Sequence, residues 1–124
     1  MLIDVMKAKR VDNNHTEIIN QAKSLGISVQ SLHELGKGCP DVLFGYGGIN
    51  IFAEIKNGNN NLNQQQIDYH QNWKGQICTI RNIDELIIEF LSYSNTIGDI
   101  IMVMDLYMKY IGGKNETEVT LNNE

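Results

Sequence analysis

The stretch 38–56 constrains the fold of this chain more than any other part of it. It reads GCPDVLFGYGGINIFAEIK, in which Gly47-Gly48 separates two runs rich in β-branched and aromatic residues. Two glycines between such runs are a signal for a two-residue β-hairpin turn. This turn predicts the cross-strand pairs Tyr46 with Ile49, Leu43 with Phe52, and Asp41 with Glu54.

The alternation of side chains along the hairpin separates an apolar face from a charged one. Because successive residues of a strand point to opposite faces, Asp41, Glu54 and Lys56 share one face. The other face carries only apolar and aromatic side chains, namely Val42, Phe44, Tyr46, Ile49, Ile51, Ala53 and Ile55. We therefore expect one face to be core and the other to end in two carboxylates and a lysine.

Asp41 and Glu54 are expected to oppose each other at the open end of the hairpin. Opposed like charges destabilise a strand pair, so this arrangement needs a neutralising group. A divalent cation is the simplest candidate, and the backbone carbonyl of Ile55 could add a third oxygen ligand. Lys56 would lie beside the metal, where its ammonium could hold a phosphate. In the alternative interpretation, Asp41 is a turn residue after Pro40, and the other two are solvated strand positions.

Two further motifs follow the hairpin, Asn57-Gly58 and Leu62-Asn63-Gln64-Gln65-Gln66. The whole order is Gly-x-Pro-Asp, a strand, a turn, a strand that ends in Glu-x-Lys, and then these two motifs. It resembles the PD-(D/E)XK nuclease superfamily and, within it, the small VRR-NUC branch. Members of that branch resemble Holliday-junction resolvases and are frequent in bacteriophage genomes. The resemblance extends from about Asn14 to Phe90.

The resemblance implies a metal-dependent endodeoxyribonuclease that hydrolyses DNA phosphodiester bonds with Mg²⁺ or Mn²⁺. Branched or double-stranded DNA is the expected substrate. Asp41, Glu54 and the Ile55 carbonyl would be metal ligands, and Lys56 would be the catalytic lysine. Glu17 matches an acidic residue on the first helix that assists the metals in this family. The alternative is a nuclease-fold subunit of a larger assembly that binds DNA or protein without cutting.

Two expected nucleic-acid contacts have a simpler explanation beside the functional one. The resemblance assigns Gln66 to the family's glutamine, but Asn63 and Gln66 also form a capping box that needs no catalytic role. Asn63 departs from the family, which usually has Ser or Thr there, although Asn also caps helices well. Lys37 lies in a Gly-rich loop that could approach a phosphate or could be a plain connector.

The remaining elements complete an α/β pattern. Apolar spacing predicts a helix from Asn13 or Asn14 to Gly26, a strand over Ile27 to His33, a helix after Asn63, a strand over Gln76 to Arg81 and a helix capped by Asn82. This order predicts a restriction-endonuclease-like αβββαβ core with one mixed sheet flanked by helices. We expect a single domain over 1–111, with its core at about 14–93 and an extra helix at about 95–111. Residues 112–124 are expected to be a polar, disordered tail.

Charge and hydropathy bear on the partners. The net charge is −5, but residues 1–83 carry eight basic and seven acidic side chains, so the expected core is nearly neutral and the acids gather in the last third. DNA binding should therefore be metal-dependent and salt-sensitive. The apolar helix at 95–111 either forms a homodimer contact or packs on its own domain. No run is apolar enough to cross a membrane, so we expect a cytoplasmic protein, in the host cytoplasm if phage-encoded. His15, His33 and His70 are too scattered to suggest a zinc site and are not expected to be ligands, with His33 the most open of the three because it could end a strand near the carboxylates.

Overall fold

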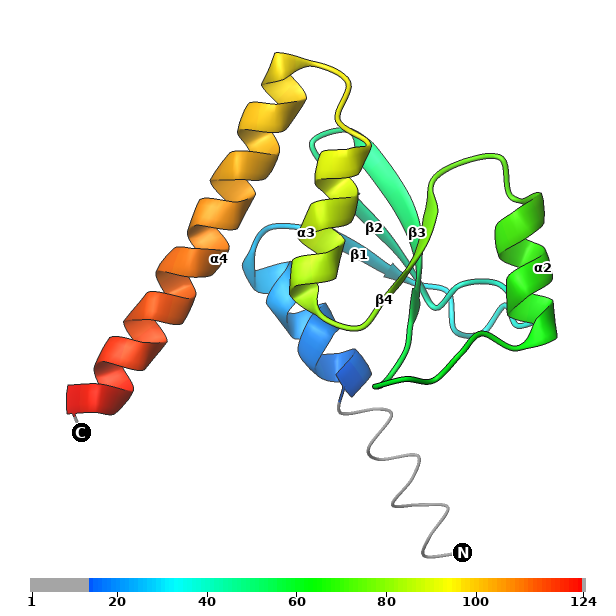
Figure 1. Ribbon diagram of the computed structural model, residues 1–124, viewed down its shortest axis with the longest axis horizontal. Coiled ribbons are helices and arrows are strands. Elements are labelled where there is room, and N and C mark those ends of the chain that lie inside the picture. Colours follow the sequence, from blue (N-terminus) through cyan, green and yellow to red (C-terminus); the bar gives the residue numbers. More distant parts are fainter. Residues whose placement is uncertain (1–13, 124) are drawn as a thin grey trace, which may run out of the picture.

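The computed structural model describes the backbone of residues 14–123 and the side chains up to Lys114. A helix over residues 14–24 comes first (Figure 1). It is followed by β1 (Ser28–Ser31), β2 (Val42–Tyr46), β3 (Ile49–Ile55), α2 (Gln64–Asn72), β4 (Ile77–Ile80), α3 (Ile83–Ser92) and α4 (Ile97–Asn123). The predicted α/β class with one mixed sheet and flanking helices is confirmed. Asn13, one of the two predicted caps, lies outside the described residues, as do residues 1–12.

The four strands form one sheet in the order β1-β2-β3-β4. The first three strands are antiparallel, and β4 runs parallel to β3. The predicted hairpin register is confirmed, because Tyr46 pairs with Ile49 and Leu43 with Phe52. Gly47 and Gly48 have φ values of 59° and 81°, in the left-handed region that a type I′ hairpin turn requires. The last pair is Val42 with Ala53, so Asp41 and Glu54 occupy the next position along the two strands.

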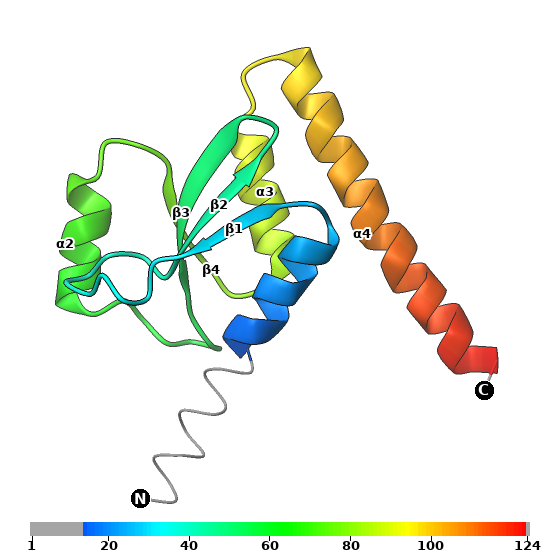
Figure 2. The same cartoon turned by 180° about the vertical axis from the view of Figure 1, so that it is seen from behind.

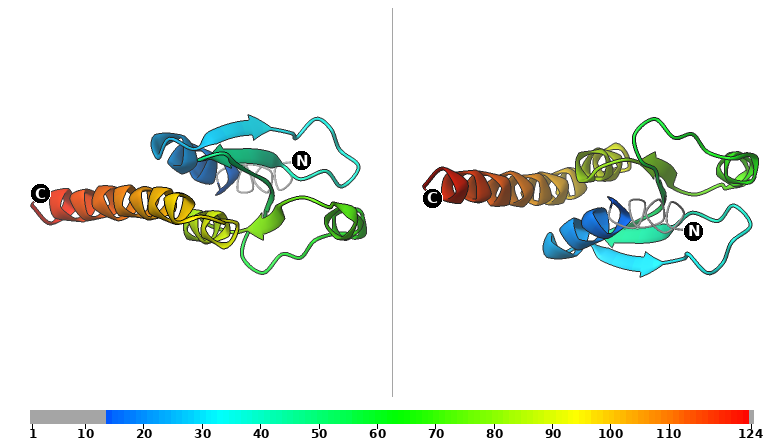
Figure 3. Two further views of the ribbon diagram at one scale, coloured as in Figure 1. Left: turned by 90° about the horizontal axis from the view of Figure 1, so that it is seen from above. Right: turned by 90° about the horizontal axis from the view of Figure 1, so that it is seen from below.

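The core lies on one face of the hairpin, as the alternation predicted. Val42, Phe44, Ile51 and Ala53 are completely buried. The N-terminal helix contributes Ile18 and Ala22 to this core, and the turn after it contributes Leu25. From α3 come Ile83, Leu86, Ile87 and Phe90. Figure 2 shows the N-terminal helix and α3 close to the sheet, and Figure 3 shows α2 at the end of the sheet far from α4.

The long helix α4 packs on α3 through only part of its surface. Val103 and Leu106 are buried, and the Tyr110 hydroxyl donates to Asp84 Oδ2 at 3.1 Å. The helix continues through Gly112 and Gly113 to Asn123, whereas the sequence predicted an end near 111 and a disordered tail. Two glycines inside a helix cost about 1 kcal/mol each, which a helix already anchored upstream through Val103 and Leu106 can tolerate. Within residues 14–123, none of the helices combines the length and apolar character that a membrane crossing needs.

Candidate active site

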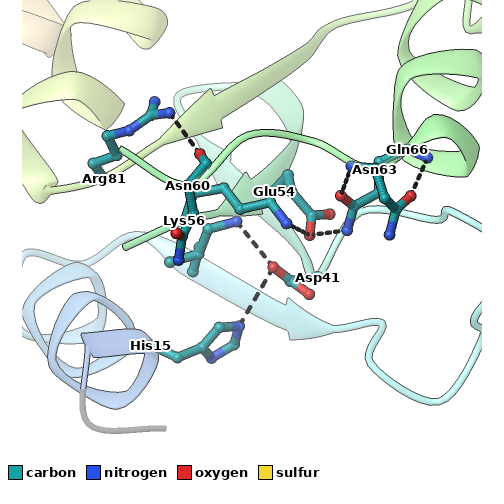
Figure 4. Close-up of polar contacts among 9 residues, drawn as sticks. His15, Asp41, Glu54, Lys56, Asn60, Asn63, Gln66 and Arg81 are labelled. Carbon is teal, nitrogen blue, oxygen red and sulfur yellow. Dashed lines mark hydrogen bonds and ion pairs between the residues drawn. The ribbon is translucent and has the colours of Figure 1, made fainter. Parts of the chain in front are cut away.

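A cavity of about 440 Å³ lies where β2 begins and β3 ends (Figure 4). Its walls come from four places in the chain: the start of the N-terminal helix, the end of β1, the Pro40-Asp41 junction and the exit of β3. The lining residues are Asn14, His15, Ser31, His33, Asp41, Glu54, Ile55, Lys56, Asn57 and Asn60. The hairpin register therefore brings Asp41, Glu54, Ile55 and Lys56 into one cavity, as the sequence predicted for these four.

Asp41 is held from two sides. Its backbone carbonyl accepts a hydrogen bond from the Leu32 amide at 2.8 Å, which ties it to the end of β1. Its carboxylate Oδ2 accepts from the Ile55 amide at 2.9 Å. The preceding Pro40 is fully buried, so the chain enters β2 along a fixed path. The Asp41 side chain thus satisfies a backbone donor at the exit of β3 and keeps its second oxygen for other contacts.

Glu54 is the one buried charged side chain among the described residues, with 3% of its surface exposed. Its Oε1 accepts from Gln66 Nε2 at 2.7 Å and lies 3.9 Å from the Lys56 ammonium. Its Oε2 is buried and has no hydrogen-bond partner within the part of the chain that the structure describes. A buried carboxylate oxygen without a donor is costly, so this atom needs either a proton or a cation.

The environment of Glu54 favours the protonated form. Burial, and next to it the nearby Asp41 charge, raise the pKa of Glu54 to about 8, although the Lys56 charge acts in the opposite direction. Desolvation disfavours a charged group, and a neighbouring like charge adds to that penalty. Near neutral pH and without a cation, Glu54 therefore keeps its proton. Two carboxyl groups with such different environments are typical of sites that hold a proton or a metal ion.

Gln66 joins α2 to this site. Its side-chain Oε1 accepts from the backbone N–H of Asn63 at 2.9 Å, and the Asn63 side chain accepts from the backbone N–H of Gln66 at 2.9 Å. The predicted capping box is thus confirmed. The side-chain Nε2 of Gln66 donates to Glu54, so this side chain both caps α2 and forms part of the site. The sequence could not show this, because the second contact depends on how α2 packs beside β3.

Arg81 fixes the loop that follows β3. Its Nε donates to the Gly58 carbonyl at 2.7 Å, and its Nη2 donates to the Asn60 carbonyl at 3.0 Å. Because Asn57 and Asn60 line the cavity, these two bonds hold one of its walls. In the sequence, Arg81 was only the end of a strand. Its carbonyl partners lie 23 and 21 positions earlier, so no local pattern could indicate them.

Two histidines that were not expected to be ligands line the cavity. His15 Nε2 lies 3.9 Å from Asp41 Oδ2, and His33 is another lining residue. His15 precedes the buried Ile18 by three positions, so helical spacing already placed it on the inward side of its helix. That spacing was the signal that could have identified it.

Two predicted contacts lie elsewhere. Glu17 is exposed and is not among the residues that line the cavity. Lys37 is exposed, has a φ of 55°, and lines a separate hollow together with Gln65 and Asp68 of α2. The structure therefore brings Gln66 to the carboxylates but brings neither Glu17 nor Lys37 to the cavity.

Asp41 and Glu54 are the side chains here that could hold a cation. Within the described part of the chain, no three His, Cys, Asp or Glu side chains form a ready set of metal ligands. Any bound ion would therefore need backbone oxygen or water in addition to the two carboxylates. Comparison with protein-family models, with curated proteins and with solved structures finds no match to this chain.

Proposed function

We propose that this chain is a metal-dependent nuclease of the PD-(D/E)XK type that hydrolyses DNA phosphodiester bonds. The observation that carries the proposal is Glu54, a buried carboxylate with an unpartnered oxygen beside the second carboxylate of Asp41. A stable fold gains nothing from such a pair, because replacing it by apolar side chains would remove the cost of burial. A divalent cation would compensate both charges.

The donor atoms suit Mg²⁺ or Mn²⁺. Asp41 and Glu54 offer hard carboxylate oxygens, the Ile55 carbonyl is the proposed third ligand, and the open cavity leaves room for water. When bound, such an ion neutralises charge on a phosphate and lowers the pKa of water. This chemistry is the part of hydrolysis that the side chains of the chain could not supply alone.

The residues around the two carboxylates have distinct tasks in this proposal. The Lys56 ammonium, 3.9 Å from Glu54 Oε1, is placed to offset negative charge that develops on the phosphate. Gln66 donates to Oε1 of Glu54, so Oε2 would be the oxygen available to hold the ion. His15 lies against Asp41 Oδ2 and orients that carboxylate. The N-terminal helix thus supports the site through His15, and the proposal does not need Glu17.

Cleavage is tested with the full-length protein and Mn²⁺ or Mg²⁺ on plasmid, single-stranded and four-way-junction DNA. We expect wild-type protein to cut at least one substrate, and Asp41→Ala and Lys56→Ala to lose at least 99% of that activity. Glu34→Ala, at an exposed acidic position in the loop before β2, is the matched control and should cut normally. Equal activity in wild type and Asp41→Ala would exclude the proposed nuclease activity.

A titration calorimetry experiment separates the enzyme from a nuclease-fold subunit that only binds DNA or protein. The nuclease should bind Mn²⁺ with an affinity that falls when either Asp41 or Glu54 is replaced. A binding subunit should show no Mn²⁺ binding that depends on both carboxylates. The second candidate is favoured by one feature only, the uncovered apolar surface of α4.

That surface leads us to propose a homodimer through α4. Ile97, Ile101, Met104 and Met108 recur at spacings of four, three and four residues, the pattern of a helix seam that faces another helix. All four are exposed, from 54% for Ile101 to 78% for Ile97, and Ile100 and Tyr107 widen the same stripe. Together they expose on the order of 600 Å² of apolar surface, close to one partner's share of a standard interface. A second copy fits because a two-fold axis pairs such a stripe with itself.

A further inference from the structure

A second surface feature begins beside the proposed active site. Phe52 lies two positions before Glu54 on β3 and therefore on the same face of the sheet. Its ring contacts Trp73 edge-on at a centroid distance of 4.6 Å and Tyr69 at 6.4 Å. The rings of Tyr69 and Trp73 are stacked, 5.8 Å apart with an interplanar angle of 12°. Tyr69 lies about one helical turn after Gln66, the residue that contacts Glu54, so this aromatic cluster begins beside the proposed active site.

These rings do not form part of the core. Among its described residues, α2 contains none that is buried, and 42% of the Trp73 surface is exposed. From the sequence alone, a stripe of Gln66, Tyr69 and Trp73 on one helix is more often core than a base-stacking platform. The structure does not support that simpler explanation, because none of the three is buried: Gln66 and Tyr69 are half-buried and Trp73 is exposed. A large exposed aromatic ring that is already held by two others is preorganised to receive a flat ligand.

Trp73 forms one wall of a groove of about 620 Å³. Its lining includes aromatic and apolar side chains, two amides and one cation, among them Leu43, Asn50, Phe52, Lys74 and Gln76. Among the described residues that line the groove, none is a carboxylate, although the chain as a whole has a net charge of −5. Trp73 also lines the hollow that contains Lys37, where the carboxylate of Asp68 is another lining group. The groove thus combines flat apolar walls, amide hydrogen-bonding groups and local positive charge.

We propose that this groove binds unpaired nucleobases of a DNA strand whose backbone passes the carboxylates. An aromatic wall stacks on any base, the Asn50 and Gln76 amides can bond to base edges, and Lys74 can contact a phosphate. In a duplex, each base is already stacked and paired, so its faces cannot reach the Trp73 ring. The groove therefore selects strands that are single-stranded next to the proposed cleavage site. Its role in substrate choice rests on the proposed nuclease function, whereas its binding of bases does not.

Trp73 is the single tryptophan of the chain, so tryptophan fluorescence reports on binding at this ring. Full-length wild-type protein in EDTA is titrated with a short oligothymidylate and, separately, with a blunt duplex of the same length. We expect saturable quenching or a spectral shift with the single strand and at least tenfold weaker binding of the duplex. No change up to about 100 µM single strand, the weak end of ordinary non-specific binding, would overturn the proposal. Equal affinity for both nucleic acids would overturn it as well.

Substitutions then locate the binding. Phe52→Leu and Lys74→Ala should each weaken oligothymidylate binding about tenfold, measured by anisotropy of a labelled strand. Lys74→Ala changes an exposed position, so it remains informative if Phe52→Leu fails to fold. Lys109→Ala, at an exposed lysine on α4 outside the stripe, is the control and should bind as wild type. An effect of Lys109→Ala equal to that of Lys74→Ala would contradict a defined groove.

The binding and cleavage results distinguish the two proposals. Quenching by the single strand without any metal-dependent cleavage would support the groove and reject the nuclease. Cleavage without a fluorescence response would support the nuclease and reject the groove. The binding measurement uses no metal and no turnover, so failure of one proposal does not hide the outcome of the other.

Discussion

Gln66 donates from Nε2 to Glu54 Oε1 at 2.7 Å while its Oε1 accepts from the Asn63 amide. One side chain therefore links the N-terminus of α2 to a carboxylate at the end of β3. Together with the ring contacts that Tyr69 and Trp73 make to Phe52, the link holds a helix with no buried residue beside the sheet. It also leaves Glu54 with one satisfied oxygen and one unsatisfied one.

Replacing Gln66 should affect stability and the site together. Gln66→Ala removes a capping contact and a hydrogen bond to an acidic side chain, so we expect the free energy of unfolding to fall by about 1–3 kcal/mol. Urea unfolding measures this loss. Gln64→Ala is the control, since the Gln64 side chain donates to the exposed Asp68 and its loss should change stability by less than about 0.5 kcal/mol. A similar effect of both variants would show that the Glu54 contact contributes nothing.

Gly38 sets how closely the loop before Asp41 approaches α2. A Cβ at this position would lie 2.4 Å from the Gln65 carbonyl oxygen, and the φ of Gly38 is 80°. Gly36 has a similar φ of 60°, but among the described residues no neighbouring atom lies within 4 Å of a Cβ placed there. It is therefore the matched control. Gly36→Ala should cost about 1 kcal/mol from backbone strain alone. Gly38→Ala should cost clearly more in thermal or urea unfolding and should also reduce cleavage, because the loop must move away from α2.

Much of this arrangement could be predicted from local sequence, and the exceptions have a common cause. The Gly47-Gly48 turn determines the hairpin register by itself, and the Asn63 capping box is local as well. The contacts of His15 with Asp41 and of Arg81 with Asn60 join residues more than 20 positions apart. Such contacts depend on how separate elements pack, which no local pattern contains. The extent of α4 was missed for another reason: glycine propensity is weak beside the anchoring of the helix.

The pH dependence of stability should reveal the buried carboxyl of Glu54. Its pKa is about 8 in the folded protein and 4.5 in an ordinary environment. The folded state therefore binds more protons than the unfolded state between these values, and the metal-free protein should lose stability as the pH rises from 4.5 through 8.

Glu54→Gln removes this titration. Without metal, we expect the variant to exceed wild type in unfolding free energy at pH 9 by on the order of 1–3 kcal/mol, with the advantage disappearing below pH 4.5. The same variant should be inactive in cleavage. Urea unfolding in EDTA across this pH range measures the difference, with Glu34→Gln as an exposed control. Parallel pH profiles for wild type and Glu54→Gln would contradict a raised pKa.

His15 and Glu17 give a direct comparison between two side chains of one helix. His15 lies 3.9 Å from Asp41, whereas Glu17 is exposed and outside the cavity. We expect His15→Ala to lower kcat about tenfold with little change in stability, because Asp41 loses its orienting neighbour. Glu17→Ala should retain nearly full activity. If Glu17→Ala is the weaker enzyme, the N-terminal helix supports the site through its acid, as the family resemblance implied.

The exposed stripe on α4 predicts a concentration-dependent dimer. Sedimentation equilibrium at micromolar concentration should give twice the chain mass of 14.0 kDa for the wild-type protein. Met104→Lys places a charge at the centre of the stripe and should shift the equilibrium to monomer without unfolding the chain, because Met104 is 58% exposed. Asp105→Lys introduces the same side chain at the neighbouring exposed position outside the stripe and should leave the dimer intact. A wild-type monomer at micromolar concentration would reject a second copy as the partner of this surface. A different protein would then be the expected partner of the stripe.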